Sequence, residues 1–277
     1  MRIRISHSIA YAYAEPVRQL RQVLRLTPRD HDGQHVMSWR IEPNIDGRLR
    51  SSQDPFGNLV HDFSADGPIE NYAIEIKGMV ETVDLAGVIR GVTEKVPPAV
   101  FMRDTRLTEP SAALRDLTAE AEVRARGGSD LSRLHALLET VHETIACVPT
   151  GERVGIGAGA CLEAGEGIPQ DVAHVFMTCA RSLGAPARYV SGYVAESETL
   201  PHAGGAHAWA EAYLPDYGWI GFDCANGLCP IDTHIRVATG LDYADAAPVR
   251  GARTGGNGES LLVEVRAQAA KPRLQGQ

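Results

Sequence analysis

The sequence predicts an α+β fold, with an antiparallel β module first and a region of helices and strands after it. Residues 1 to about 82 contain short alternating or β-branched runs divided by turn signals, which is typical of antiparallel strands. Beyond them come helical patterns and three further strand candidates. Between residues 83 and 110 the periodicity is poor and Pro97-Pro98 interrupts any helix, so we expect a domain boundary near residue 100. The expected domains are therefore 1–100 and 101–277.

The β module is expected to contain five strands. Turn signals such as Asp46-Gly47 and Asp54-Pro55-Phe56-Gly57 separate the runs that predict them. The runs cover residues 2–13, 20–26, 36–42, 58–64 and 70–82.

Two helices are expected in the second part. Ser129-Asp130 can cap a helix whose apolar residues recur at helical spacing as far as Ile145. The second helix should begin close to Pro169, because proline suits the first helical position, where its missing N–H is not needed. Gly184 should end that helix. Strand candidates follow at 187–195, 206–214 and 217–223, and a glycine-rich break at 251–258 precedes a strand-like run at 261–265.

Composition limits the possible partners and location of the chain. The formal net charge of −8 disfavours a general affinity for nucleic acid or an anionic membrane. The N-terminus alternates like a strand and lacks the apolar stretch of a secretory signal, and five cysteines are too few and odd in number for a disulfide framework. We therefore expect a cytoplasmic protein without a cofactor; the oligomeric state cannot be read from the sequence.

Four segments of the second part carry a family resemblance. They are Gly167-Ile168-Pro169-Gln170-Asp171-Val172-Ala173-His174, Arg188-Tyr189-Val190-Ser191-Gly192-Tyr193, Ala206-His207-Ala208-Trp209-Ala210-Glu211 and Gly218-Trp219-Ile220-Gly221-Phe222-Asp223. Together they closely resemble the core of bacterial transglutaminase-like proteins, and residues 7–29 are similar to the N-terminal module that precedes that core. The resemblance implies a papain-like core in which the helix with the nucleophile position packs on an antiparallel sheet.

The resemblance also implies catalytic roles. In the family the first segment reads Gly-Val-Cys-Gln-Asp-Phe-Ala-His and its cysteine is the nucleophile, whereas this chain has Pro169 there. His207 matches the general base and Asp223 the acid that orients it, so we expect their side chains to meet. Proline removes the sulfur and the backbone N–H that would help to bind an oxyanion, while it suits the first turn of a helix. We therefore expect the proline to remove catalytic groups while it leaves the fold intact.

Other matched residues are weaker candidates. Gln170 and Trp209 are expected to contact a substrate, from their positions in the matched segments. Asp242 and Tyr243 are expected to do so too, because residues 240–251 also resemble the stretch that follows the acid in these proteins. Asp171 should complement the helix dipole or cap the helix.

Two alternatives to a lost nucleophile stay open. Cys161, in the glycine-rich stretch 155–167, or Cys224 can replace the missing thiol, although buried cysteines are mostly inert packing residues. An activated water can also act with His207 and Asp223. A metal site is not expected, since Cys224, Cys229 and His234 match no established zinc spacing.

The favoured function is therefore that of a transglutaminase-like homologue that binds a peptide or amide-bearing partner without turning it over. The alternative is an active cysteine protease- or amidase-type hydrolase or transferase with a relocated thiol or an activated water.

Overall fold

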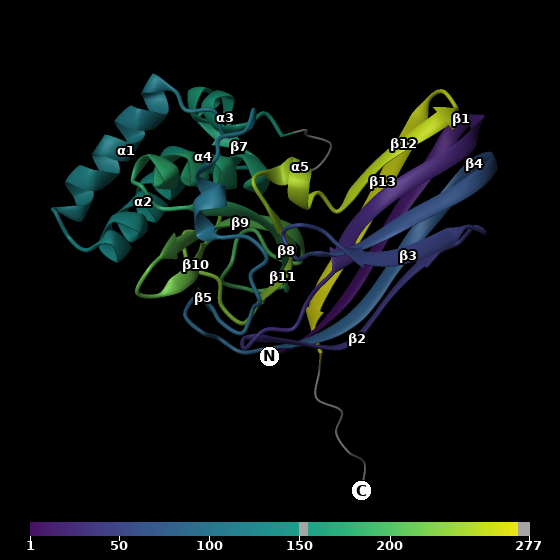
Figure 1. Cartoon of the computed structure of the whole chain (residues 1–277), viewed down its shortest axis with the longest axis horizontal. Coiled ribbons are helices and arrows are strands. Elements are labelled where there is room, and N and C mark those ends of the chain that lie inside the picture. Colours follow the sequence, from purple (N-terminus) through teal and green to yellow (C-terminus); the bar gives the residue numbers. More distant parts are fainter. Residues whose placement is uncertain (150–154, 271–277) are drawn as a thin grey trace, which may run out of the picture.

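The computed structural model describes residues 1–149 and 155–270 of the chain. Within these ranges it contains one six-stranded antiparallel sheet, here sheet A, and one five-stranded antiparallel sheet, here the core sheet, with helices packed on the core sheet (Figure 1). The α+β fold predicted from the sequence is confirmed. No helix among the described residues is long and apolar enough to cross a bilayer.

Sheet A is built around two long strands that pair with each other. Each of them replaces two of the expected shorter strands, because register shifts between Ala12 and Val17 let the pairing continue past the proline at position 16. The strand at 48–53 was not predicted, because every residue there is exposed and no alternation marks it. The N-terminal strands are β1 (Arg2–Thr27), β2 (Gln34–Pro43), β3 (Arg48–Gln53) and β4 (Leu59–Thr82).

The C-terminal part of the chain completes sheet A. β12 (Val249–Gly255) pairs with the second half of β1, and β13 (Glu259–Ala269) pairs with its first half. The glycine-rich break expected at 251–258 is therefore mostly strand and turn. Gly251 is needed in β12 because a Cβ there would lie 2.9 Å from the carbonyl oxygen of Arg21. The boundary near residue 100 stays a prediction about domains, but strands from both sides of it share sheet A.

Sheet A has two halves that share one hydrophobic cluster. The first half has the order β13-β1-β4-β2 and the second half the order β12-β1-β4-β3. The cluster includes Ile9 and Ile74 from the first half and Leu24 and Phe63 from the second. One face of each half is therefore buried by this cluster, while Arg21 of β1 and every residue of β3 are exposed.

The core sheet has the strand order β11-β8-β9-β10-β5. Its short strand β5 (Val88–Ile89) lies in the segment that was expected to be only a connection, which also contains the 3-10 helix η1 (Pro98–Met102). The three expected strands are confirmed as β8, β9 and β10, and β11 was not predicted. The bounds are β8 (Ala187–Val194), β9 (Gly205–Leu214), β10 (Gly218–Phe222) and β11 (His234–Gly240).

The helix α4 (Pro169–Ser182) forms the centre of the second part. It begins at Pro169 and ends just before Gly184, as predicted, and most of its residues are buried. It packs against β8 and β9 and against three other helices. Of these, α2 (Asp130–Thr144) is capped by the Ser129 side chain as predicted, whereas α1 (Ala112–Ala125) and α3 (Ala158–Ala164) were not predicted. The remaining elements are α5 (Tyr243–Ala246) and the parallel pair β6 (Ala146–Cys147) and β7 (Glu166–Gly167).

Two buried amide side chains join sheet A to β11, the edge strand of the core sheet. The Gln34 amide accepts from the N–H of Arg236 at 2.8 Å and donates to the carbonyl of the same residue at 2.9 Å. The Asn58 amide accepts from the N–H of Thr239 at 2.8 Å and donates to its carbonyl at 2.7 Å. Each amide therefore satisfies both outward backbone groups of one β11 residue, as a neighbouring strand would.

A buried ion cluster lies within the core sheet. Glu211 on β9 stands opposite Arg188 on β8, and its carboxylate accepts from Nε of Arg188 at 2.6 Å and from Nε of Arg236 at 2.7 Å. Arg188 also contacts Glu94 at 2.9 Å and lies over the Trp219 ring, 3.8 Å from its centroid. Burial alone would raise the pKa of Glu211, but the two guanidinium groups lower it to about 2.

Candidate functional site

The candidate site is centred on a buried histidine and a buried aspartate. His207 lies on β9 and Asp223 directly follows β10, and the antiparallel pairing of these strands brings the two residues together. Nε2 of His207 donates to Oδ2 of Asp223 at 2.8 Å. The predicted meeting of the two side chains is thus present in the structure, while their catalytic role stays a prediction.

Asp223 has further partners that the sequence did not predict. Nδ1 of His234 accepts from the N–H of Ile231 at 3.3 Å, so its Nε2 carries the proton and donates to Oδ2 of Asp223 at 3.1 Å. The side-chain amide of Asn226 donates to the same oxygen at 2.7 Å. Burial alone would raise the pKa of Asp223, but its interactions with His207 and His234 hold it well below its usual value. The carboxylate is therefore fixed in its ionised form.

Asp223 engages only one of the two ring nitrogens of His207. Because Nε2 is bound to Asp223, Nδ1 is the position at which the ring can accept a proton. The Trp209 ring is stacked beside the imidazole with centroids 6.3 Å apart. Gly192 stands opposite His207 on β8, and a Cβ there would lie 2.6 Å from the Trp209 indole. The glycine therefore leaves room for the ring that flanks the histidine.

Pro169 is the first residue of α4 and is buried. The same first turn holds Asp171, whose Oδ1 accepts from the N–H groups of Ile156 at 2.8 Å and Gly157 at 3.0 Å. Asp171 therefore binds the backbone that precedes α3, in addition to lying at the positive end of the α4 dipole as expected. Pro169 offers neither a side-chain nucleophile nor a backbone N–H at this helix end.

The expected substrate-contacting residues fall into two groups. Oε1 of Gln170 and Nε1 of Trp209 are buried and have no hydrogen-bond partner within the described ranges, and their contact with a substrate stays a prediction. Asp242 instead caps α5 by accepting from the N–H of Ala244 at 2.7 Å, and the N–H of Tyr243 donates to His174 at 3.1 Å. Among the described residues, no hydrogen bond or ring contact joins Asp242 or Tyr243 to the histidine–aspartate pair.

The five cysteines are all free thiols, and burial raises the pKa of each. Cys161, which the sequence places in a glycine-rich stretch, lies in α3, and its sulfur is so close to Gly167 that a Cβ at Gly167 would come within 2.5 Å of it. Cys224 belongs to the main hydrophobic cluster. The pKa rises from 9.0 to about 12 for Cys147 and Cys161, to about 11 for Cys179 and Cys229, and to well above 9.0 for Cys224.

Cys224, Cys229 and His234 are not grouped as the ligands of a metal ion. Across residues 1–149 and 155–270, no group of three or more histidine, cysteine or acidic side chains is arranged to hold a metal ion. His234, the histidine of that set, is instead a hydrogen-bond partner of Asp223.

An antiparallel sheet packed on a buried helix, with a histidine and an aspartate paired at the ends of adjacent strands, defines a transglutaminase-like protein of the papain-like class. Comparison with known families agrees with this class. Residues 118–224 match the family model described as "Transglutaminase-like superfamily", and residues 3–81 match the "Bacterial transglutaminase-like N-terminal region". The chain belongs to the transglutaminase-like superfamily and carries the bacterial N-terminal region.

Sequence similarity to other proteins extends over nearly the whole chain. "Uncharacterized protein ML0607" of Mycobacterium leprae is 29% identical over 95% of this chain and 97% of its own length. "Uncharacterized protein Rv2569c" of Mycobacterium tuberculosis is 26% identical over 90% of this chain and 87% of its own length. Among solved structures, "a Putative Cysteine Protease from Cytophaga hutchinsonii" is 19% identical, with a TM-score of 0.75 over 99% of this chain and 92% of that chain. This last similarity shows the shared fold.

Proposed function

We propose that this chain is a transglutaminase-like protein that binds a peptide or another amide-bearing ligand without turning it over. The observation that carries the proposal is Pro169 at the first position of α4, where the family pattern has its cysteine nucleophile. His207 and Asp223 remain paired at 2.8 Å, so the base and its orienting acid are retained while the group they would activate is absent.

Two catalytic elements are lost with one substitution. A thiol at the start of a helix is favoured as thiolate by the helix dipole, and its own N–H commonly helps to bind the oxyanion. Pro169 supplies neither group. Loss of a single oxyanion donor costs on the order of a hundredfold in rate. The proline nevertheless fits the helix, since the N–H it lacks has no intrahelical partner at this position.

The thiols of this chain support the same conclusion. Catalytic cysteines have a lowered pKa, because the thiolate is the nucleophile. Burial shifts the pKa of Cys161 to about 12, and the charge of Asp171 adds to that rise. Cys224 is buried beside Asp223 and its pKa is raised well above 9.0. Neither alternative thiol is in surroundings that would form a thiolate at neutral pH.

Site-mapped labelling with a limiting amount of a cysteine-directed electrophile at neutral pH tests the proposal. In the parent chain all five cysteines should react slowly and alike. The Pro169→Cys variant should gain one fast-reacting thiol that labels well below the pH of an ordinary thiol, because it lies at the helix N-terminus and can pair with His207. Pro169→Ser is the matched control, and His207→Ala in the Pro169→Cys background should remove the advantage.

Two results would contradict the proposal. One is fast labelling of Cys161 or Cys224 in the parent chain that disappears in His207→Ala, which would mean that the nucleophile has moved. The other is His207-dependent release of ammonia from glutaminyl peptides by the parent chain, which would mean that a water or a relocated thiol performs the reaction.

We further propose that the chain works in a reducing compartment, the cytoplasm. Support comes from its five cysteines, which are free thiols in the structure rather than disulfides. Cell fractionation with an antibody to the chain tests this location, and recovery outside the cytoplasm would contradict it.

A further inference from the structure

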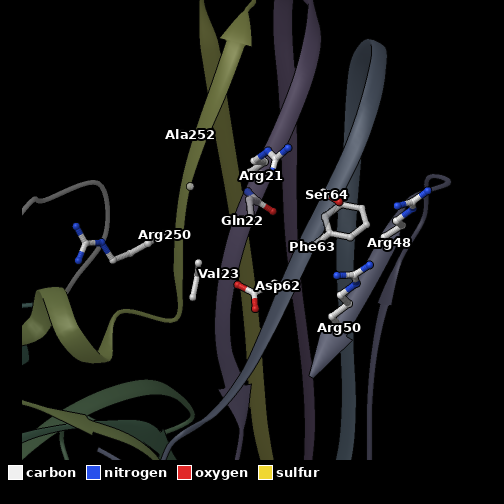
Figure 2. Close-up of a pocket in the computed structure, with 11 residues that line it drawn as sticks. Arg21, Gln22, Val23, Arg48, Arg50, Asp62, Phe63, Ser64, Arg250 and Ala252 are labelled. Carbon is white, nitrogen blue, oxygen red and sulfur yellow. The ribbon is translucent and has the colours of Figure 1, made fainter. Parts of the chain in front are cut away.

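Four arginines line a hollow of about 710 Å³ on the second half of sheet A; Figure 2 shows Arg21, Arg48 and Arg50 around it, and Arg250 at its margin with the side chain directed away from the other three. Strand register explains the arrangement. Arg21 on β1 stands in one row with Arg48 on β3, across Ser64 of β4. Side chains two residues apart on a strand point to the same face, so Arg50 lies on the same face as Arg48. Arg250 belongs to this face too, because it stands opposite Val23, two residues from Arg21. We call Arg21, Arg48, Arg50 and Arg250 the arginine face.

The arginine face has little internal charge compensation. Asp62 is the one acidic residue that lines the hollow, and it stands opposite Arg50 in the β3–β4 register. Within the part of the chain that the structure describes, no ion pair involves any of the four arginines. Arg250 donates one hydrogen bond, from Nη1 to the carbonyl of Ala244 at 2.9 Å. Positive charge is thus concentrated on one face of a chain whose formal net charge is −8.

Protection of sheet edges explains only part of this arrangement. Charged side chains on edge strands block pairing with other chains, and β3 and β12 are edge strands of the second half. This accounts for the arginines of β3 and β12. It does not account for Arg21, because β1 is paired on both sides, with β12 and with β4. Protection of sheet edges therefore does not explain why Arg21 lies between the arginines of β3 and β12.

We propose that the arginine face binds an extended acidic segment of a polypeptide. Guanidinium groups pair with carboxylates through two parallel hydrogen bonds. Adjacent strands lie about 4.8 Å apart, so β12 and β3 are separated by about 14 Å across β1 and β4. In an extended peptide, residues i and i+4 are also about 14 Å apart and point the same way. Acidic residues at i, i+2 and i+4 therefore match the width of the face.

A peptide fits this face better than nucleic acid does. The overall charge of −8 repels nucleic acid, which carries a phosphate at every nucleotide, more strongly than a peptide with a few carboxylates, and Asp62 adds a local negative charge in the hollow. Separate carboxylates can instead meet individual arginines. The proposal concerns sheet A and not the His207–Asp223 site, so it can hold or fail independently of the proposed core function.

Fluorescence anisotropy of the full chain with a labelled Glu-Ser-Glu-Ser-Glu peptide tests this proposal, with Gln-Ser-Gln-Ser-Gln as the uncharged control. Arg21→Glu and Arg50→Glu should each weaken binding about tenfold or more, because they remove a partner and repel the peptide. Arg4→Glu is the matched control. Arg4 is also an exposed arginine of β1 but lies in the first half, away from the hollow, so its reversal changes the net charge equally and should change the affinity little.

Three outcomes would overturn the proposal. The first is no binding of the glutamate peptide by the parent chain, and the second is equal weakening by Arg4→Glu and Arg50→Glu, which would mean unspecific charge attraction. The third is tighter binding of a single-stranded oligonucleotide or of inorganic phosphate than of the peptide, which would assign the face to another anion.

Discussion

Replacing Glu211 with glutamine removes the one carboxylate that Arg188 and Arg236 share in the core sheet. The side chain of Glu211 is fully buried, and only 1% of the Arg188 side chain is exposed, so the variant leaves buried cations without their main partner. Breaking a buried ion pair from one side costs about 3 to 5 kcal/mol. We expect the free energy of unfolding to fall by that amount at pH 7.

The pKa of Glu211 gives an independent measure of the same interaction. The pKa is about 2 in the folded chain, against an ordinary value of 4.5 in the unfolded chain. A folded pKa below the unfolded one means stabilisation that is fully present above pH about 4.5 and is lost as the pH falls through about 2. The difference corresponds to about 3 kcal/mol. The deficit of Glu211→Gln relative to the parent should therefore shrink by about 2 kcal/mol between pH 7 and pH 3.

Urea unfolding of the parent and variant from pH 7 to pH 3 measures this deficit. Glu94→Gln is the control, because its side chain is 29% exposed and it contacts only Arg188 of the pair; it should cost about 1 kcal/mol or less. A Glu211→Gln deficit below about 1 kcal/mol at pH 7, or one that does not change with pH, would refute the reasoning.

Two further predictions concern packing and are also measured by urea unfolding. Asn58→Ala should cost about 2 to 3 kcal/mol, because the buried N–H and carbonyl of Thr239 lose their partner; a cost below about 0.5 kcal/mol would contradict this. Gly192→Ala should cost about 3 kcal/mol, because the new Cβ would lie 2.6 Å from the Trp209 indole and 2.2 Å from a β11 carbonyl oxygen. Gly159→Ala, where a Cβ meets nothing within 4 Å, is its control and should be neutral or stabilising.

The parts of the fold that were predictable are those with a local signal. Ser129 marked the start of α2, and Pro169 marked the start of α4, because capping and a missing N–H act within one turn of the chain. The pairing of His207 with Asp223 followed from the order of the matched segments. β3 and β12 gave no such signal, since one is exposed throughout and the other is rich in glycine. Both exist because they pair with long strands that are distant in sequence.

The partners of Asp223 were missed for a related reason. His234 reaches the carboxylate from β11, and Asn226 reaches it from the turn between Asp223 and Leu228. Neither residue lies in a matched segment. The sequence offered His234 only as an unconvincing metal ligand, because which ring a buried carboxylate meets depends on how three strands are packed.

The pairing of β12 and β13 with β1 affects how the chain is synthesised. A ribosome releases residues 2–27 long before residues 249–269, yet β1 lies between β4 and these late strands. One side of β1 must therefore wait, unpaired, while more than two hundred residues emerge and the core sheet forms. An unpaired strand attracts other chains, so this interval is when the nascent protein is most exposed to aggregation. Synthesis of its last strands completes the sheet that its first strand begins.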